Sequence, residues 1–420
     1  MNEAEQKRIV VIGAGPAGMM AAIKAAENGA KVTLLEKMKK PGRKMMITGK
    51  GRCNITNAAD VPEIIKNICG NGAFLNSALR AFDNQDVINF FESQNVLTKV
   101  ERGNRVFPVS DKAQDVVDAM MHRLHELDVS LITQMPVTAI IAKSGRAAGV
   151  ITASGALYEA DAVILCTGGA SYPGTGSTGD GYKMATKIGH KLVPLRASLV
   201  PLETEEEWVR EVQGLSLKNV SATLLVNGKK IDSLFGEMMF THFGVTGPII
   251  LSLSRIAADY LLDKENLVEL SINLKPALSE EKLLARVKRD FEKYQRKQIA
   301  NAMVDLLPHK LIPIILDLAF VDLEKPVHQL TAKERLRLVL TMQHLDLTLT
   351  KTRPLAEAIV TAGGVSVKEI NPKTMESKII PRLYFAGEVA DVDAYTGGYN
   401  LQAAFSMGAA AGNWSVWNDD

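Results

Sequence analysis

The hydrophobic pattern of the first 36 residues places one long run of small residues between two short apolar runs. Residues 8–12 (RIVVI) and 31–35 (KVTLL) are short and rich in β-branched residues, which predicts two buried strands. Residues 16–28 are rich in alanine and methionine, which predicts a helix that starts at Pro16 and stops at Gly29. The order strand–helix–strand predicts a parallel βαβ unit.

Further apolar runs predict a sheet assembled from both ends of the chain. Residues 136–141 and 148–152 predict strands of a small β-meander, whereas 161–166 and 382–386 each predict a strand that ends in a glycine-containing turn. A helical run follows at about residue 400. The expected fold class is α/β, with a Rossmann-type domain of three-layer ββα architecture at residues 1–190 and 356–420.

The middle of the chain predicts an insertion into this domain. Residues 199–274 alternate strand-like pieces with turns, and Asn227-Gly228 is a hairpin signal. Residues 279–320 look helical with breaks at Pro308 and Pro313, and 331–342 predict one more helix. We therefore expect an inserted β-rich domain at 191–275 and 343–355, and a small helical domain at 276–342.

A glycine fingerprint follows the first strand directly, in the order Gly13-x-Gly15-x-x-Gly18. Gly13 permits a tight turn, Gly15 lets a pyrophosphate approach the backbone, and Gly18 lets helix and strand pack closely. The helix N-terminus then offers unpaired N–H groups to the phosphates. Glu36 ends the second strand, where its carboxylate can accept hydrogen bonds from ribose hydroxyls. These residues predict a bound dinucleotide without a 2′-phosphate.

Three other segments favour FAD over NAD as this dinucleotide. Residues 41–57 form a basic, glycine-rich stretch that predicts a loop along an anionic ligand, with Arg43, Lys44 and Arg52 as its cations. Residues 161–169 run from a strand into a small-residue turn. Near the C-terminus, Glu388 can accept a ribityl hydroxyl, and the helix that opens near Asn400 can direct N–H groups at the flavin N1/O2 edge. NAD has no ribityl chain, so we expect noncovalent FAD.

A second G-x-G-x-x-G stands at residues 174–179. It is separated from its strand, and no acid ends a clear second strand about 20 residues later. We interpret it as a loop and helix near the flavin rather than as a second nucleotide domain.

Four motifs carry a family resemblance: T-G-K-G-R-C-N-I-T-N at 48–57, T-H-F-G-V-T-G-P at 241–248, T-A-G-G-V at 361–365 and G-E-V-A-D-V-D-A-Y-T-G-G-Y-N-L-Q-A-A-F at 387–405. With the fingerprint, they resemble the BaiN-like, or aminoacetone-oxidase-like, FAD-binding flavoproteins. The resemblance implies an NAD(P)/FAD-dependent oxidoreductase, with amine oxidation and enone reduction among the proposed activities. The expected FAD contacts are Gly13, Gly15, Pro16, Ala17, Gly18, Glu36, Lys37, Arg43, Thr48, Arg52, Cys53, Asn54, Val137, Thr167, Gly168, Gly169, Gly387, Glu388, Asn400, Leu401 and Gln402.

Composition limits the partners and the type of chemistry. Lys and Arg number 49 and Asp and Glu 47, so the net charge of +2 gives no reason to expect nucleic acid or an acidic membrane surface. Apolar runs of about 18 residues are absent, so no membrane span is expected. Cys53, Cys69 and Cys166 form no C-x-x-C pair, which argues against a redox dithiol. With no signal-peptide pattern, we expect a cytoplasmic protein; the oligomeric state is not predicted.

The expected reaction is hydride transfer at flavin N5 with a small-molecule substrate, and NAD(P)H is the expected transient electron donor. An amine oxidase that uses oxygen, a tRNA-modifying flavoprotein and a flavin-holding module without turnover remain alternatives. Arg52, Tyr395 and His242 are the candidates for polarising the substrate or moving a proton. The basic run at 288–297 is interpreted as a solvated helix face, with contact to RNA or lipid as the alternative.

Overall fold

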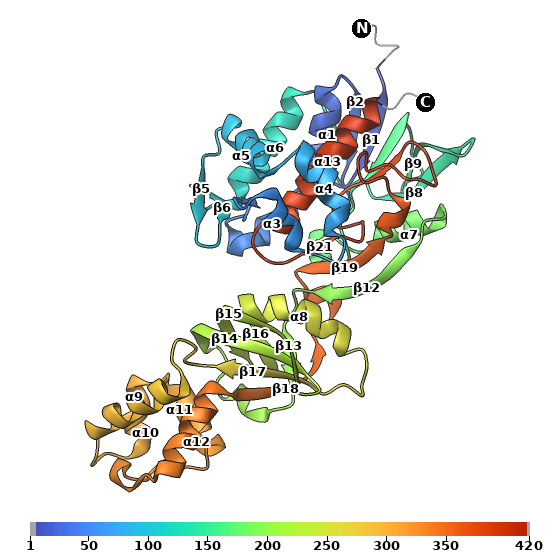
Figure 1. Ribbon diagram of the computed structural model, residues 1–420. Coiled ribbons are helices and arrows are strands. Elements are labelled where there is room, and N and C mark those ends of the chain that lie inside the picture. Colours follow the sequence, from blue (N-terminus) through green and yellow to red (C-terminus); the bar gives the residue numbers. More distant parts are fainter. Residues whose placement is uncertain (1–5, 418–420) are drawn as a thin grey trace. The chain divides into compact units, whose positions relative to one another are not determined.

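The computed structural model describes residues 6–417, and these form two compact units (Figure 1). Unit 1 combines residues up to 197 with residues from 355 onward, and unit 2 is the segment 198–354 between them. Each unit has its own cluster of buried hydrophobic residues. Unit 1 is therefore formed by two separate segments of the chain that share one hydrophobic core.

A five-stranded parallel sheet forms the centre of unit 1, in the order β20-β11-β1-β2-β7. Its strands are β20 (Leu383–Phe385), β11 (Ala162–Leu165), β1 (Arg8–Ile12), β2 (Lys31–Leu35) and β7 (Ser130–Ile132). The apolar residues of β1 and β11 are buried because these strands have a neighbour on both sides. The sheet therefore joins strands from the start, the middle and the end of the chain.

Two further layers contact this sheet. Helices α1 (Pro16–Glu27) and α13 (Tyr399–Trp417) pack on it and on each other. An antiparallel meander of β8 (Val137–Lys143), β9 (Arg146–Thr152) and β10 (Leu157–Glu159) forms the other layer. The predicted α/β fold class with a Rossmann-type sheet and a meander is confirmed.

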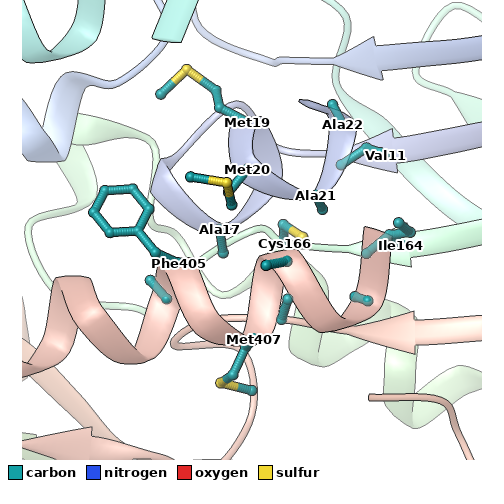
Figure 2. Packing of buried hydrophobic residues seen from close by; sticks show 14 of the residues in the cluster. Val11, Ala17, Met19, Met20, Ala21, Ala22, Ile164, Cys166, Phe405 and Met407 are labelled. Carbon is teal, nitrogen blue, oxygen red and sulfur yellow. The ribbon is translucent and has the colours of Figure 1, made fainter. Parts of the chain in front are cut away.

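Small residues allow α1 and α13 to approach each other closely (Figure 2). A Cβ atom on Gly408 would lie 2.4 Å from the backbone oxygen of Ala17, and one on Gly412 would lie 2.4 Å from that of Ala21. Phe405 is fully buried in the same cluster. The start of α1, which carries the glycine fingerprint, is thus held by the last helix of the chain.

Between β2 and β7, unit 1 contains short elements that the hydrophobic pattern did not predict. A small antiparallel sheet consists of β3 (Thr56–Asn57), β6 (Arg105–Pro108) and β5 (Thr98–Glu101). The α-helices of this segment are α2 (Arg43–Ile47), α3 (Val61–Lys66), α4 (Asn76–Ala81), α5 (Asn84–Ser93) and α6 (Ala113–Glu126). A two-residue strand, β4 (Ile68–Cys69), pairs with β21 (Asp393–Ala394), which connects this segment to the C-terminal part of the chain.

Unit 2 contains a closed antiparallel barrel. Its strands, in spatial order, are β13 (Leu202–Thr204), β16 (Gly244–Thr246), β15 (Lys229–Thr241), β14 (Ser216–Val226), β17 (Val268–Asn273) and β18 (Leu345–Thr352). Val226 pairs with Lys229, so the predicted hairpin at Asn227-Gly228 is confirmed. Helix α8 (Pro248–Tyr260) packs on β15, although the sequence predicted only strands in this stretch.

Helices complete unit 2: α9 (Glu280–Glu292), α10 (Ile299–Ala302), α11 (Ile312–Leu318) and α12 (Ala332–Gln343). Pro308 lies between helices as predicted, but the predicted break at Pro313 is wrong, because this proline occupies the first turn of α11. A missing N–H has little cost there. The strands β12 (Leu192–Ser198) and β19 (Val360–Val365) pair in unit 1 beside the junctions with unit 2. Within residues 6–417, no helix combines the length and apolarity that a membrane span requires.

Candidate functional site

The glycine fingerprint forms the turn between β1 and α1, and its glycines have different surroundings. A Cβ on Gly13, whose φ is +99°, would lie 2.6 Å from the backbone oxygen of Cys166, and a Cβ on Gly18 would lie 1.8 Å from that of Gly13. A Cβ on Gly15 would meet no atom within 4 Å. Gly13 and Gly18 are therefore required by the protein's own packing, whereas the space beside Gly15 fits a pyrophosphate at the start of α1.

Glu36 lies at the end of β2 and is 9% exposed. Its carboxylate accepts hydrogen bonds from the backbone N–H groups of Ala14 and Met38, both at 2.7 Å. A carboxylate has about four acceptor positions, so two remain for ribose hydroxyls. The contact with Ala14 also connects the predicted ribose contact to the predicted phosphate loop.

The second glycine motif lies beside the residues that follow Glu36. The Nζ atom of Lys37 donates to the hydroxyl of Thr178 and lies 2.6 Å from Oδ2 of Asp180. Burial opposes ionisation of Asp180, but the hydrogen bonds from Lys37 and Thr178 outweigh it and lower the pKa of this carboxyl. Asp180 begins helix α7 (Asp180–Lys187), so the interpretation of this motif as a loop and a helix is confirmed.

The predicted basic loop at 41–57 is partly helical, which corrects that prediction. Helix α2 (Arg43–Ile47) begins after Gly42, whose φ is +68°, and a short 3-10 turn covers Thr48–Gly51. The N–H of Gly42 donates to the carbonyl of Ala14, so this segment lies against the fingerprint. Arg43 is exposed. Cys53 is fully buried, and burial raises the pKa of its thiol to about 12, so it stays protonated at neutral pH.

Arg52 is held within its own segment. Its Nη1 lies 2.9 Å from Oε1 of Glu101 and 3.3 Å from Oδ1 of Asp111, and its guanidinium lies over the ring of Phe107. The hydrogen bond with Glu101 is the main reason why the pKa of Arg52 is raised. Arg52 is therefore paired with two carboxylates, and a substrate would have to compete with them for the guanidinium.

Two predicted FAD contacts have buried polar atoms without a hydrogen-bond partner in the described part of the chain: Oδ1 of Asn54 and Oγ1 of Thr167. Buried polar atoms in native proteins are nearly always paired. Thr167 follows β11 and precedes Gly168 and Gly169, at the carboxyl end of the parallel sheet where α/β proteins bind nucleotides. These atoms fit a ligand with hydroxyl and N–H groups, such as FAD.

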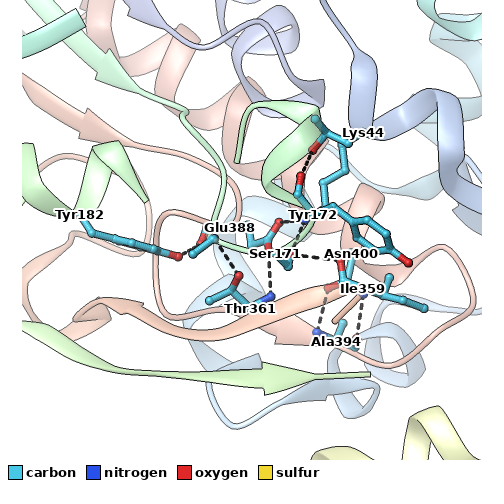
Figure 3. Close-up of polar contacts among 11 residues, drawn as sticks. Lys44, Ser171, Tyr172, Tyr182, Ile359, Thr361, Glu388, Ala394 and Asn400 are labelled. Atoms are coloured by element: carbon cyan, nitrogen blue, oxygen red, sulfur yellow. Dashed lines mark hydrogen bonds and ion pairs between the residues drawn. The ribbon is translucent and has the colours of Figure 1, made fainter. Parts of the chain in front are cut away.

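Glu388 is the centre of a polar cluster after β20 (Figure 3). Its Oε1 accepts from the N–H of Thr361 at 2.7 Å and from the hydroxyl of Ser171 at 3.1 Å, and its Oε2 lies 2.7 Å from Nζ of Lys44. One acceptor position of the carboxylate remains for a ribityl hydroxyl. Gly169 is needed beside this cluster, because a Cβ there would lie 2.6 Å from Oε1 of Glu388.

Sequence reasoning did not include Ser171, Thr361 and Tyr182 among the site residues. Thr361 opens the T-A-G-G-V motif, so a signal for it was present. Tyr182 donates its hydroxyl hydrogen to the carbonyl of Glu388. Burial raises the pKa of Tyr182, and the charge of Glu388 acts in the same direction, so its phenol stays protonated.

The C-terminal contacts lie at the start of α13. Asn400 accepts from the N–H of Ala394 at 2.9 Å and donates to its carbonyl at 2.7 Å, which fixes the turn before the helix. Gln402 is fully buried and uses its amide inside the protein, with Thr56, Ser406 and the carbonyl of Phe82. The side chain of Leu401 packs on the core of unit 1.

The structure places every predicted FAD contact in unit 1, including Val137 at the start of β8 and Gly387, where a Cβ would lie 2.9 Å from Cβ of Ala17. Of the three catalytic candidates, Arg52 and the half-buried Tyr395 also belong to unit 1. His242 belongs to unit 2, where it is exposed in the turn between β15 and β16 and contacts the ring of Phe243.

A family model and two curated relatives each match this chain over almost its whole length. The family model described as HI0933-like protein Rossmann domain matches residues 7–414. A 3-dehydro-bile acid delta(4,6)-reductase from Clostridium scindens is 32% identical over 410 residues, which cover 96% of this chain and 98% of the relative. A ribosomal RNA dihydrouridine synthase from Haemophilus influenzae is 31% identical over 405 residues, which cover 96% of each chain.

Among solved structures, 3-ketosteroid delta1-dehydrogenase from Sterolibacterium denitrificans, in complex with 1,4-androstadiene-3,17-dione, has a TM-score of 0.54 at 13% identity. The match covers 98% of this chain and all of that one. A flavocytochrome c3 fumarate reductase in an open conformation has a TM-score of 0.51 at 16% identity, over 98% of this chain and 78% of that chain. At these identities the likeness concerns the fold.

Proposed function

Because this chain belongs to the HI0933-like family of FAD-binding Rossmann flavoproteins, which are oxidoreductases, we propose that it reduces a carbon–carbon double bond conjugated to a carbonyl group. The observation that carries the proposal comes from two relatives that match this chain along nearly their full length. The reactions that their names describe share the same chemistry. A 3-dehydro-bile acid with delta(4,6) double bonds is a conjugated ketone. Uridine, the precursor of dihydrouridine, has its 5,6 double bond conjugated to the C4 carbonyl.

Bound FAD would supply a hydride from N5 to the substrate, after reduction by NAD(P)H as the proposed donor. The protein would hold this cofactor through the fingerprint, Glu36, Asn54, Thr167 and the Glu388 cluster. Saturation of a conjugated double bond also requires a proton at the carbon next to the carbonyl, and a partner for the carbonyl oxygen. These two tasks fall to side chains of the protein.

Tyr395 is our first candidate for the proton donor. Its backbone is fixed on both sides, because its N–H donates to the carbonyl of Asn67 and its carbonyl accepts from the side chain of Asn400 at 3.3 Å. Asn400 lies in the first turn of α13, whose N-terminus is the proposed partner of the flavin N1/O2 edge. Arg52 and His242 remain candidates for polarising the carbonyl, and Arg52 would first have to exchange its contact with Glu101.

Anaerobic spectroscopy of the FAD-loaded protein tests this function. NADPH or NADH should bleach the flavin absorbance, and a 3-oxo-Δ4 steroid, a simple enone or a uridine-containing RNA should restore it without oxygen. Tyr395→Phe should slow this restoration by about 100-fold, in the range of general acid catalysis, while bleaching by the donor continues. Bleaching by a primary amine, with restoration only by oxygen, would replace the proposal with amine oxidation. A protein that takes up no FAD would overturn the cofactor assignment.

A further inference from the structure

Unit 2 contains a groove that the proposed flavin chemistry does not use. It lies along α9 and has a volume of about 620 Å³. Its charged lining residues are Lys282, Arg286, Arg289, Lys293, Asp290 and Asp305. The groove thus presents four cations and two carboxylates, in the same region as the basic run that the sequence pattern indicated.

The local charge differs strongly from that of the whole chain. Residues 275–297 contain eight Lys and Arg and four Asp and Glu, and eight minus four gives a net charge of +4. The whole chain, from which no nucleic-acid partner was expected, has a net charge of +2. Positive charge is therefore concentrated on one segment rather than spread over the surface.

A buried carboxylate orients the two arginines of the groove. Asp290 is 5% exposed, and its Oδ2 and Oδ1 lie 3.4 Å and 3.6 Å from the Nε atoms of Arg286 and Arg289. Both contacts use Nε, which leaves the terminal nitrogens of the two guanidiniums outside the pairing with Asp290. Paired guanidinium nitrogens of this kind bind phosphate in a bidentate manner.

The cations follow one face of α9 at intervals of three or four residues. With a rise of about 1.5 Å per residue, Lys282 and Lys293 are about 16 Å apart along the helix axis. A nucleic-acid strand has about one phosphate per 3.4 Å of axis, so this face spans four to five phosphates. Tyr294 lies next to the row, and its ring already has contacts within unit 2, because Nζ of Lys297 lies 4.6 Å from the ring centroid and the hydroxyl donates to Oδ2 of Asp305 at 2.8 Å.

We propose that this groove binds the phosphate backbone of RNA. The observations favour RNA over a lipid surface. A membrane-bound amphipathic helix needs an outward apolar face, but in α9 Leu283, Val287 and Phe291 are buried in the core of unit 2, and Leu284 packs against that core. The groove offers charge and a concave surface, which suit a nucleic-acid strand.

Fluorescence anisotropy with a labelled single-stranded RNA and a labelled RNA hairpin tests this binding on the full-length, FAD-loaded protein. The affinity should fall steeply as salt rises. Arg286→Gln with Arg289→Gln should weaken binding at least 10-fold and reduce the salt slope by about two. The matched control is Lys229→Gln with Lys230→Gln, which removes the same charge from an exposed hairpin of the same unit and should change binding little.

Replacing both arginines leaves the buried carboxylate of Asp290 without these two cations, which destabilises the fold. If this variant does not fold, a second variant provides the test. Lys282→Gln with Lys293→Gln leaves the contacts of Asp290 intact and should reduce the slope equally. RNA affinity unchanged in a folded groove variant, or the absence of RNA binding at low salt, overturns the inference. Binding only to phosphatidylserine vesicles would do the same and indicate a lipid surface. Groove-dependent RNA binding without flavin reoxidation by any conjugated substrate would leave the groove in place and overturn the proposed function instead.

Discussion

At the scale of single residues, the glycines of the fingerprint have two distinct roles. Gly18 has no room for a side chain because its position faces the backbone of Gly13. Gly15 has room, and its φ of −84° suits any residue, so the protein alone gives no reason for glycine there. A ligand that approaches the backbone at this point explains the residue.

This difference makes a prediction for two alanine variants. Gly15→Ala should leave the free energy of unfolding of the apoprotein within about 0.5 kcal/mol of wild type, as is usual away from packed sites, and weaken FAD binding at least 10-fold. Gly18→Ala should instead destabilise the apoprotein by about 1–3 kcal/mol through overpacking. Urea unfolding and FAD titration measure the two effects. Equal destabilisation by both variants would contradict the role given to Gly15.

His190 is the residue whose environment predicts a pH effect. It is buried between Oε2 of Glu369, 3.2 Å from Nδ1, and the hydroxyl of Ser377, 2.9 Å from Nε2, with the ring of Phe385 against it. Burial lowers the pKa of His190, and Glu369 opposes this shift without cancelling it. The imidazole in the folded protein is therefore harder to protonate than in the unfolded chain.

The sign of the pH effect follows from this difference. Above a pH of about 6.5 both states hold a neutral imidazole, whereas below it the unfolded chain takes up a proton first. The free energy of unfolding should therefore fall on acidification, by at most about 1.4 kcal/mol per pH unit from this group. His190→Asn should lose less stability than wild type between pH 7.5 and 5.5 in urea titrations. Equal losses in both proteins would assign the effect to other groups.

At the scale of elements, the contact between α1 and α13 connects the two ends of the chain to the site. Gly408 faces Ala17 in the first turn of α1, and Gly412 faces Ala21 one turn later. Gly408→Ala and Gly412→Ala should each lower the free energy of unfolding by about 1–3 kcal/mol, because a methyl group forces the backbones apart. FAD affinity should fall more in Gly408→Ala, since Ala17 lies beside the phosphate loop. Equal affinities in both variants would show that α13 does not position this loop.

Elements with a simple period were predictable from the sequence, and others were not. The bounds of β1 and β2 agree with the predictions because each strand is one apolar run between turn residues. Residues 61–108 of unit 1 instead contain short helices and strands without a sustained period, whose order comes from packing on the rest of unit 1. Helix α8 was missed because its run PIILSLS reads equally well as a strand.

The site was predictable where one motif contains the whole contact, as at Gly13–Gly18 and Glu36. It was not predictable where contacts join distant segments. Sequence spacing does not show that Lys44, Ser171 and Thr361 meet at Glu388, nor that Arg52 pairs with Glu101. Both arrangements depend on tertiary packing, so they became visible only in the structure.

At the scale of the whole molecule, unit 2 is inserted into the sequence of unit 1 between residues 197 and 355. Within unit 2, the N–H of Arg353 donates to the carbonyl of Pro201 at 3.0 Å, so the two ends of this unit lie side by side. All members of one hydrophobic cluster belong to unit 1, and all members of the other belong to unit 2. Separate cores of this kind are typical of domains that fold independently.

We therefore expect that unit 1 binds FAD without unit 2. A variant in which a short Gly-Ser linker replaces residues 202–352 should fold, acquire the flavin spectrum and bind FAD within about 10-fold of the full-length affinity, because every proposed FAD contact lies in unit 1. Saturating FAD, at about 100 times its dissociation constant, should stabilise this variant by about 2.7 kcal/mol, as in any protein that binds ligand only when folded. RNA binding should disappear with the groove on α9. A soluble variant that takes up no FAD, beside a full-length protein that does, would show that unit 2 contributes to the cofactor site itself.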